Sequence, residues 1–212
     1  MAQCNVVILI SGSGSNLQAL IDQSKTAEYT IASVISNNAD AYGLQRATRA
    51  GIPTLVIDHR DFADRKEFDL ALQEAIDAIN PNLLVLAGFM RILGADFVSH
   101  FSGRILNIHP SLLPKFQGTR THERALEAGE KEHGASVHFV TEDLDGGPVI
   151  AQERIKVRAD DTADSLQRRV LQKEHLLYPK VVKWFAGGRL AMRDGQAWLD
   201  NNPLPATGVP AS

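Results

Sequence analysis

The sequence predicts an α/β fold: a Rossmann-like, mixed but mostly parallel sheet with helices on both faces, in a single domain. Three observations predict it. Short apolar runs alternate with helical segments over the first half of the chain. The first run leads into a Gly/Ser loop and then a helix, the order found in phosphate-binding units. Two later apolar runs lie close together in the sequence, so we expect them to pair antiparallel and make the sheet mixed.

Composition limits the kind of protein. The chain has 212 residues, enough for a substantial core, and its 44% hydrophobic content is ordinary for a soluble protein. Its net charge of -3 provides no broad basic surface for nucleic acid. The one cysteine, Cys4, cannot form an internal disulfide, which fits a reducing compartment. The sequence shows no signal segment and no membrane-spanning run, so we expect a cytoplasmic protein without membrane partners. Its oligomeric state is expected to be a monomer or a homodimer.

Four apolar runs in the first half are predicted to be strands, the first of them buried. They cover residues 5–10, 30–36, 53–57 and 83–87. Segments with helical spacing separate them, at residues 17–21, 41–50 and 64–80. Gly51 and Pro53 follow the second of these helices, where they typically end a helix. Ligands of such a sheet are expected at the carboxyl ends of its strands.

The second half continues the alternation. A short helix over residues 95–101 leads to the strand that ends at His109, and Thr121 is expected to cap a helix over residues 122–128. Strands over residues 136–140 and 149–157 precede a long helix over residues 162–186, in which Pro179 is a candidate bend. We expect one domain over residues 1–188. Residues 189–212 would form an extension on the same domain, with a hairpin-like stretch and a loose Pro/Gly-rich end.

The loop after the first strand is Ser-Gly-Ser-Gly-Ser-Asn at residues 11–16. Its amides and the positive end of the helix dipole would face an anion. A dinucleotide is not favoured, because Leu17 occupies the third glycine position and no acidic residue follows the next strand. We interpret the loop as a monophosphate site formed by Gly14, Ser15 and Asn16. A tight strand–helix turn without a ligand is the alternative.

The stretch that ends the fifth strand carries the strongest chemical signal. Asn107 and His109 are two residues apart, so their side chains point to the same side of an extended strand. Asp145 lies in a Gly-rich loop that could fold back and favour a charged imidazole, and Asn107 could donate a hydrogen bond to an oxyanion. No nucleophile elbow and no metal-binding spacing is present. Residue types alone leave open whether these residues catalyse direct transfer or form a buried cap of the strand.

Several motifs occur in order along nearly the whole chain. They are Ile-Ser-Gly-Ser-Gly-Ser-Asn-Leu at 10–17, Ala-Gly-Phe-Met-Arg-Ile-Leu at 87–93, Asn-Ile-His-Pro-Ser-Leu-Leu-Pro at 107–114, Ser-Val-His-Phe-Val at 136–140 and Asp-Gly-Gly-Pro-Val-Ile at 145–150. This set resembles the folate-dependent formyltransferases. Within the family it is most similar to members that formylate glycinamide ribonucleotide in purine synthesis.

The resemblance implies roles for individual residues. Asn107, His109 and Asp145 would be catalytic, and Gly14, Ser15, Asn16 and Glu174 would bind the ribonucleotide. The cosubstrate would be 10-formyltetrahydrofolate, with no metal and no nicotinamide. Its binding residues would be Arg65, Met90, Arg91, Ile92, Leu93, Asn107, Thr141, Glu142, Asp143, Leu144 and Asp145.

Three alternatives remain from the sequence. A family member that formylates initiator tRNA would be expected to carry an extra basic C-terminal domain. A formyltetrahydrofolate hydrolase would be expected to carry an N-terminal regulatory domain, whereas here the first strand begins almost at Met1. A binding or scaffold module without activity is the third, and the complete set of Asn107, His109 and Asp145 argues against it.

Overall fold

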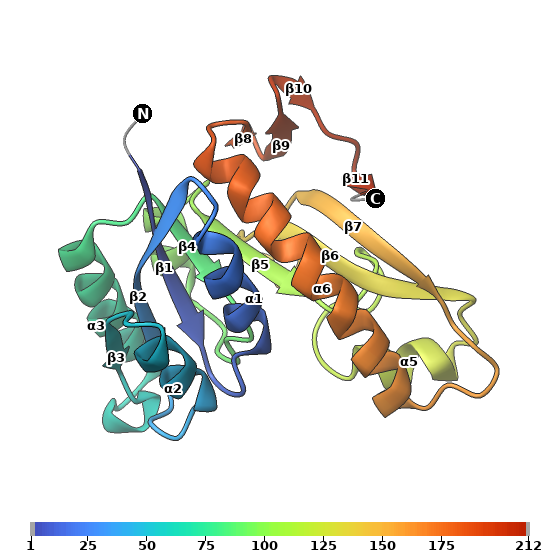
Figure 1. Cartoon of the computed structure of the whole chain (residues 1–212), viewed down its shortest axis with the longest axis horizontal. Coiled ribbons are helices and arrows are strands. Elements are labelled where there is room, and N and C mark those ends of the chain that lie inside the picture. The colour runs from blue at the N-terminus through green and yellow to red at the C-terminus, as the bar shows by residue number, and fades with distance from the viewer. Residues whose placement is uncertain (1–2, 211–212) are drawn as a thin grey trace. The chain divides into compact units, whose positions relative to one another are not determined.

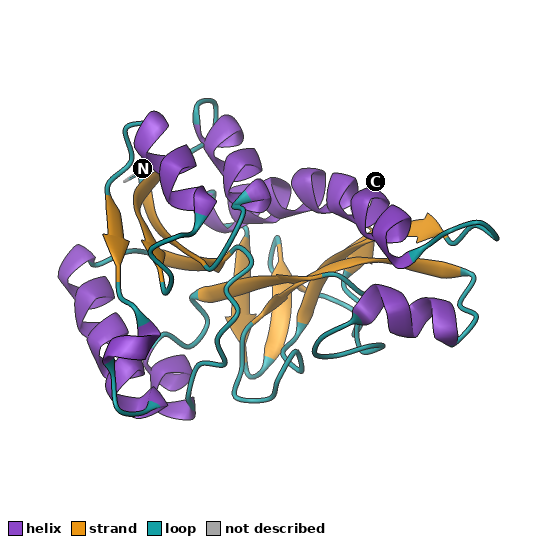
Figure 2. Ribbon diagram, turned by 90° about the horizontal axis from the view of Figure 1, so that it is seen from below, coloured by secondary structure: helices purple, strands orange, loops and turns teal. Residues whose placement is uncertain are grey.

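The structure is a computed structural model that describes residues 3–210 (Figures 1 and 2). The chain divides into two compact units, Met1–Leu106 and Asn107–Ser212. Within the described residues, no helix is both long and apolar enough to cross a membrane. The predicted division into residues 1–188 and an extension over 189–212 stays a prediction.

The first unit is built on parallel strands in the order β4-β1-β2-β3. β1 lies between two neighbours and is almost entirely apolar, so five consecutive side chains are buried. The elements are β1 (Cys4–Ile10), α1 (Ser15–Ser24), β2 (Tyr29–Ser36), α2 (Tyr42–Arg49), β3 (Thr54–Val56), η1 (His59–Asp61), α3 (Arg65–Ile79), β4 (Leu83–Leu86) and α4 (Ala95–His100).

Local chemistry explains where the helices of this unit begin and end. The Asp64 carboxylate accepts a hydrogen bond from the Glu67 N–H and so caps the start of α3. Asn80 ends the helix in the left-handed conformation. Between them, Phe68, Leu72 and Ile76 are buried at four-residue spacing. The predicted helix over residues 64–80 is confirmed, because its periodicity and its caps agree.

The second unit contains the strand order β11-β7-β6-β5 and a small separate sheet, β10-β9-β8. β6 and β7 pair antiparallel, as predicted. Figures 1 and 2 show α6 lying along this hairpin, which it contacts on both strands. The elements are β5 (Ile105–His109), α5 (Thr121–Glu127), β6 (Glu132–Phe139), β7 (Val149–Lys156), α6 (Ala163–Ala186), β8 (Leu190–Arg193), β9 (Gln196–Leu199), β10 (Asn202–Pro203) and β11 (Val209–Pro210).

Two predictions for this unit were wrong. Thr121 does not cap α5: the residue before the helix is Arg120, at φ 56°, and Thr121 is the buried first helical residue. The end of the chain is not loose as far as Pro210, because β11 pairs in parallel with β7 (Figure 1). The pairing supplies backbone hydrogen-bond partners that the Pro/Gly-rich composition did not suggest. Residues 211–212, which the prediction also covered, lie outside the described residues.

Gly14→Ala tests the contact between the loop before α1 and the helix α2. Gly14 has φ 69°, and an added Cβ would lie 2.6 Å from the Gly43 Cα. We expect the free energy of unfolding, measured in urea, to fall by about 2–4 kcal/mol, from backbone strain and the clash together. Gly12→Ala is the control, since nothing lies within 4 Å of its added Cβ. Equal stability of the two variants would contradict this account of the packing.

His133 makes stability depend on pH. Its Nε2 lies 3.2 Å from the Nδ1 of His122, and burial followed by this neighbour lowers the pKa of His133 to about 4. An unfolded histidine has a pKa near 6.5, so between pH 6.5 and 4 only the unfolded chain binds the proton. We expect this residue to cost about 3 kcal/mol of stability as the pH falls through that window.

Urea unfolding at pH 7 and pH 4.5 measures this loss. His133→Gln should flatten the pH dependence. His100→Gln, at an imidazole that is 40% exposed, is the control and should retain the wild-type loss of stability. The same slope in wild type and His133→Gln would rule out His133 as its source.

Candidate active site

A buried carboxylate between two imidazoles lies at the end of β5. Asp145 Oδ2 is 3.4 Å from His109 Nδ1, and Asp145 Oδ1 is 3.6 Å from His138 Nε2. The Asn107 amide nitrogen is 3.1 Å from His138 Nε2. At most 9% of each of the three charged-pair side chains is exposed. The structure therefore brings together the three residues singled out by the sequence and adds His138.

His138 was missed as a site residue. The sequence placed it only within the motif at residues 136–140, yet Ser136 and His138 are two apart on β6 and are both buried. A buried polar pair with the alternation of a strand was the available signal. What the sequence could not supply was the partner across the sheet, Asn107 of β5.

Hydrogen bonds assign the proton on His109. Its Nε2 lies 2.8 Å from the carbonyl oxygen of Phe116. A carbonyl only accepts, so Nε2 carries a hydrogen and Nδ1 faces Asp145. Burial lowers the pKa of His109, and this outweighs the Phe116 carbonyl and the Asp145 carboxylate, which raise it. The balance favours the neutral imidazole, opposite to the charged state expected from the sequence, because desolvation is the larger effect.

Hydrogen bonds also assign the proton on His138, which contacts the Asn107 amide. His138 Nδ1 lies 2.9 Å from the Phe139 carbonyl oxygen and therefore donates to it. In the neutral ring Nε2 then has a lone pair, which accepts from the Asn107 amide. A charged His138 would instead donate from Nε2 toward Asp145.

Asp145 is held as an anion. Burial alone would raise its pKa, but the nearby His138 imidazole, the hydrogen bond from the Gly118 N–H and the His109 imidazole leave the pKa lowered. The Gly118 N–H donates to Oδ2 over 2.9 Å. Gln117 donates from its side chain to the Asp145 carbonyl over 3.2 Å. The segment after His109 therefore contacts both members of the pair: Phe116 holds the imidazole, and Gly118 holds the carboxylate.

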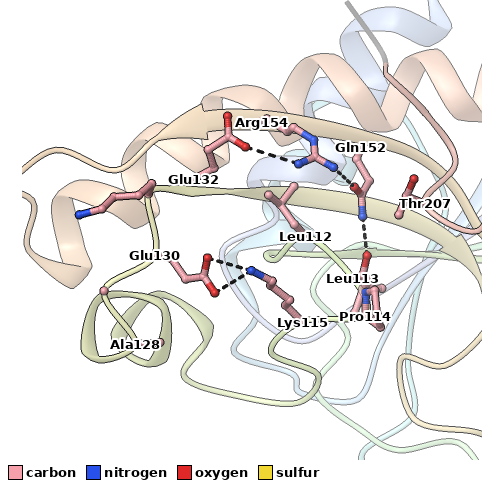
Figure 3. A pocket seen from close by; sticks show the side chains of 12 residues that line it. Leu112, Leu113, Pro114, Lys115, Ala128, Glu130, Glu132, Gln152, Arg154 and Thr207 are labelled. Carbon is pink, nitrogen blue, oxygen red and sulfur yellow. Dashed lines mark hydrogen bonds and ion pairs between the residues drawn. The ribbon is translucent and has the colours of Figure 1, made fainter.

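Hydrogen bonds from polar side chains also fix the turn that follows His109. The Ser111 hydroxyl donates to the Lys115 carbonyl over 2.6 Å, and the fully buried Ser136 hydroxyl donates to the Ser111 carbonyl over 2.7 Å. Gln152 donates to the Leu113 carbonyl over 2.8 Å, as Figure 3 shows. Each bond joins the turn to itself or to the β6–β7 hairpin. These bonds fix the turn in addition to Pro110 and Pro114, whose rings restrict φ.

A cavity of about 420 Å³ lies on the outer side of this turn (Figure 3). Lys115 pairs across it with Glu130 at 2.8 Å, and Glu132 pairs with Arg154 at 3.5 Å. The paired charges leave no strong preference for one kind of ligand. We assign no function to this cavity.

The glycine-rich loop of the first unit has the geometry of an anion site. Gly14 adopts φ 69° immediately before α1. The backbone N–H groups of Ser13, Gly14 and Ser15 donate to no group within the part of the chain that the structure describes. Asn16 is buried in the first turn of the helix. Free N–H groups at a helix N-terminus are suited to a phosphate.

The segment after β4 forms an apolar surface. The Met90 N–H donates to the Ser11 hydroxyl over 2.8 Å, which fixes the backbone. The Met90 side chain is 77% exposed and that of Ile92 is 59% exposed, so neither is part of the core. Arg91 is exposed and Leu93 is half-buried.

Of the remaining predicted folate residues, all but Thr141 are exposed. Arg65 is the exposed first residue of α3, and Glu142, Asp143 and Leu144 are exposed in the loop after β6, with Thr141 half-buried. Glu174, predicted for the ribonucleotide, lies on α6 and is 7% exposed. Between residues 3 and 210, no group of three or more His, Cys, Asp or Glu side chains is arranged to hold a metal ion.

Comparisons with known proteins agree with this chemistry. The family model described as formyl transferase matches residues 4–182. The chain is 54% identical to phosphoribosylglycinamide formyltransferase of Escherichia coli over 98% of this chain and 99% of that protein. It is 45% identical to the enzyme of the same name from Haemophilus influenzae, over 96% of this chain and 97% of that protein.

A solved structure extends the agreement to the fold. The phosphoribosylglycinamide formyltransferase of Coxiella burnetii, in complex with CHES, matches with a TM-score of 0.95 and 54% identity over 99% of both chains. This confirms the predicted fold class, a Rossmann-like, mixed and mostly parallel sheet with packed helices. The family model matches most of the chain, and the named relatives align with it over nearly their whole length. The chain therefore belongs to the formyltransferase family.

Proposed function

We propose that this chain transfers a formyl group from 10-formyltetrahydrofolate to the amine of 5′-phosphoribosylglycinamide in de novo purine biosynthesis. The observation that carries the proposal is the set of half-buried Asn107 with the buried side chains of His109 and Asp145, an amide, an imidazole and a carboxylate without a nucleophilic side chain. Such a set fits direct attack by the substrate amine. The relatives named above, which match over the full chain, support the choice of substrates. We place this activity in the cytoplasm.

The reaction begins when the glycinamide amine attacks the formyl carbon on N10 of the folate. The carbonyl oxygen becomes an oxyanion, and the amide of Asn107 donates a hydrogen bond to it. Negative charge beside His109 raises the pKa of the imidazole, which is otherwise lowered by burial. The raised pKa favours the imidazolium, whose positive charge stabilises the oxyanion and is paired by Asp145. The proton that His109 takes up from solvent returns to solvent when the intermediate collapses.

The intermediate then collapses by a balanced proton transfer. The attacking nitrogen loses one proton, and N10 gains one as its bond to the formyl carbon breaks. Asp145, ionised because hydrogen bonds lower its pKa, is positioned to relay this proton through water. The products are the formylated amine and tetrahydrofolate, and no covalent enzyme intermediate forms.

Binding roles follow the chemistry of each surface. Gly14, Ser15 and Asn16 would hold the phosphate, and Glu174 would contact the ribonucleotide. The exposed surface of Met90, Arg91, Ile92 and Leu93 would hold the pterin ring, together with the loop of Thr141, Glu142, Asp143, Leu144 and Asp145. Arg65 would act on the folate side.

An acceptor assay tests the substrates. With purified protein and 10-formyltetrahydrofolate, we expect folate release only when glycinamide ribonucleotide is present. The reason is that a direct-transfer site without a nucleophile needs the amine to attack. Initiator tRNA and water alone are the comparison acceptors. Release with water alone would identify a hydrolase, and release with tRNA would identify a different transferase.

Three substitutions test the site. We expect kcat to fall by about 100-fold or more in each of three variants: Asn107→Ala, His109→Ala and Asp145→Asn. Each variant loses a group that stabilises the oxyanion or that helps a proton pass from the attacking nitrogen to N10. Steady-state kinetics with circular dichroism would show lost turnover with a retained fold. His100→Ala, an exposed histidine of α4, is the control and should keep wild-type turnover. Near-normal turnover of any site variant removes that residue from the mechanism.

A further inference from the structure

The glycine-rich loop is held in place by α2. The Gly12 carbonyl accepts a hydrogen bond from the Gly43 N–H over 3.0 Å. The next carbonyl, that of Ser13, accepts from the Arg46 Nε over 2.9 Å. Two consecutive carbonyls of the loop are therefore turned toward the same helix.

This fixes where the neighbouring N–H groups point. In a planar trans peptide unit the C=O and the N–H point in opposite directions. Because the carbonyls of Gly12 and Ser13 are hydrogen-bonded to α2, the N–H groups of Ser13 and Gly14 point away from that helix. These are N–H groups that donate to nothing within residues 3–210. Successive N–H groups aimed to one side form an anion-binding concavity.

Arg46 also brings a positive charge without a carboxylate partner in the described chain. Its Nη1 donates to the neutral Gln18 side chain over 3.2 Å, and its guanidinium lies 5.0 Å from the ring centroid of Tyr42. Its Cδ would be 3.5 Å from a Cβ built on Gly14. The charge is thus held beside the loop and is available to attract a phosphate dianion.

We propose that Arg46 is a positioning residue for the phosphate end of the substrate. It turns the Ser13 peptide so that the loop N–H groups face the phosphate, and it adds an uncompensated charge behind them. Arg46 acts through the loop and not by contact with the substrate. The inference rests on the proposed function in so far as the ligand is a ribonucleotide phosphate.

Arg49 is a matched control on the same helix. Its guanidinium also lies over Tyr42, at 5.6 Å, and donates to neutral groups, the Tyr42 hydroxyl and Gln45. It makes no hydrogen bond to the loop among the described residues. Arg49→Gln therefore removes an equal charge from α2 without releasing the Ser13 carbonyl.

Kinetics with two acceptors separate this role from simple structural damage. Arg46→Met should lower kcat/KM for glycinamide ribonucleotide about tenfold or more, mainly through KM, because a charge-assisted hydrogen bond is lost. The second acceptor is the glycinamide ribonucleoside, which lacks the 5′-phosphate. With this acceptor, Arg46→Met and wild type should have equal kcat/KM. Arg46→Lys, which keeps the charge, should recover part of the loss, and Arg49→Gln should match wild type with both acceptors.

A binding measurement makes the test independent of turnover. Inorganic phosphate should raise the Tm of wild type and Arg49→Gln, and this rise should be absent in Arg46→Met. Equal losses with both acceptors, or an unchanged phosphate-dependent rise in Tm, would overturn the proposal. Failure of the proposed function would look different: wild type itself would not use glycinamide ribonucleotide, while the phosphate measurement would still decide the role of Arg46.

Discussion

The buried carboxylate of Asp145 is the constraint on which the second unit's site depends. A charge removed from water needs partners in place, because desolvation otherwise forces it to the neutral form. The partners come from separate segments: the Gly118 N–H after the turn, His109 of β5 and His138 of β6. A single ion therefore requires the strand end, the turn and the hairpin to hold one arrangement.

The two imidazoles differ because of the carbonyls that hold them. Phe116 accepts from His109 on the nitrogen away from the carboxylate, so His109 turns Nδ1 to Asp145. His138 is held at Nδ1 by its neighbour Phe139, which leaves Nε2 for Asn107 or Asp145. Burial lowers the pKa of His109. In the proposed reaction, the imidazole would gain positive charge as the oxyanion forms beside it.

The glycine-rich loop shows a related use of backbone groups. Its N–H groups can serve a phosphate because its carbonyls are occupied elsewhere, by Gly43 and Arg46 of α2. Gly14 and Gly43 allow the approach, since a Cβ on either would meet the other segment. The tight turn in the structure is compatible with the proposed phosphate site, so the two alternatives from the sequence do not exclude each other.

The sequence by itself determined the elements, the family and the shared face of Asn107 and His109. Periodicity, caps and motif order are local properties, so the helix over residues 64–80 and the β6–β7 pairing were predicted. Tertiary structure decided the rest: the strand pairing of the chain's end, the place of Thr121 inside its helix, the addition of His138, and the contact of Arg46 with Ser13. It also buries His109, which lowers the pKa of an imidazole that the sequence led us to expect charged. These features depend on residues far apart in the chain and on how deeply each is buried, which no local pattern records.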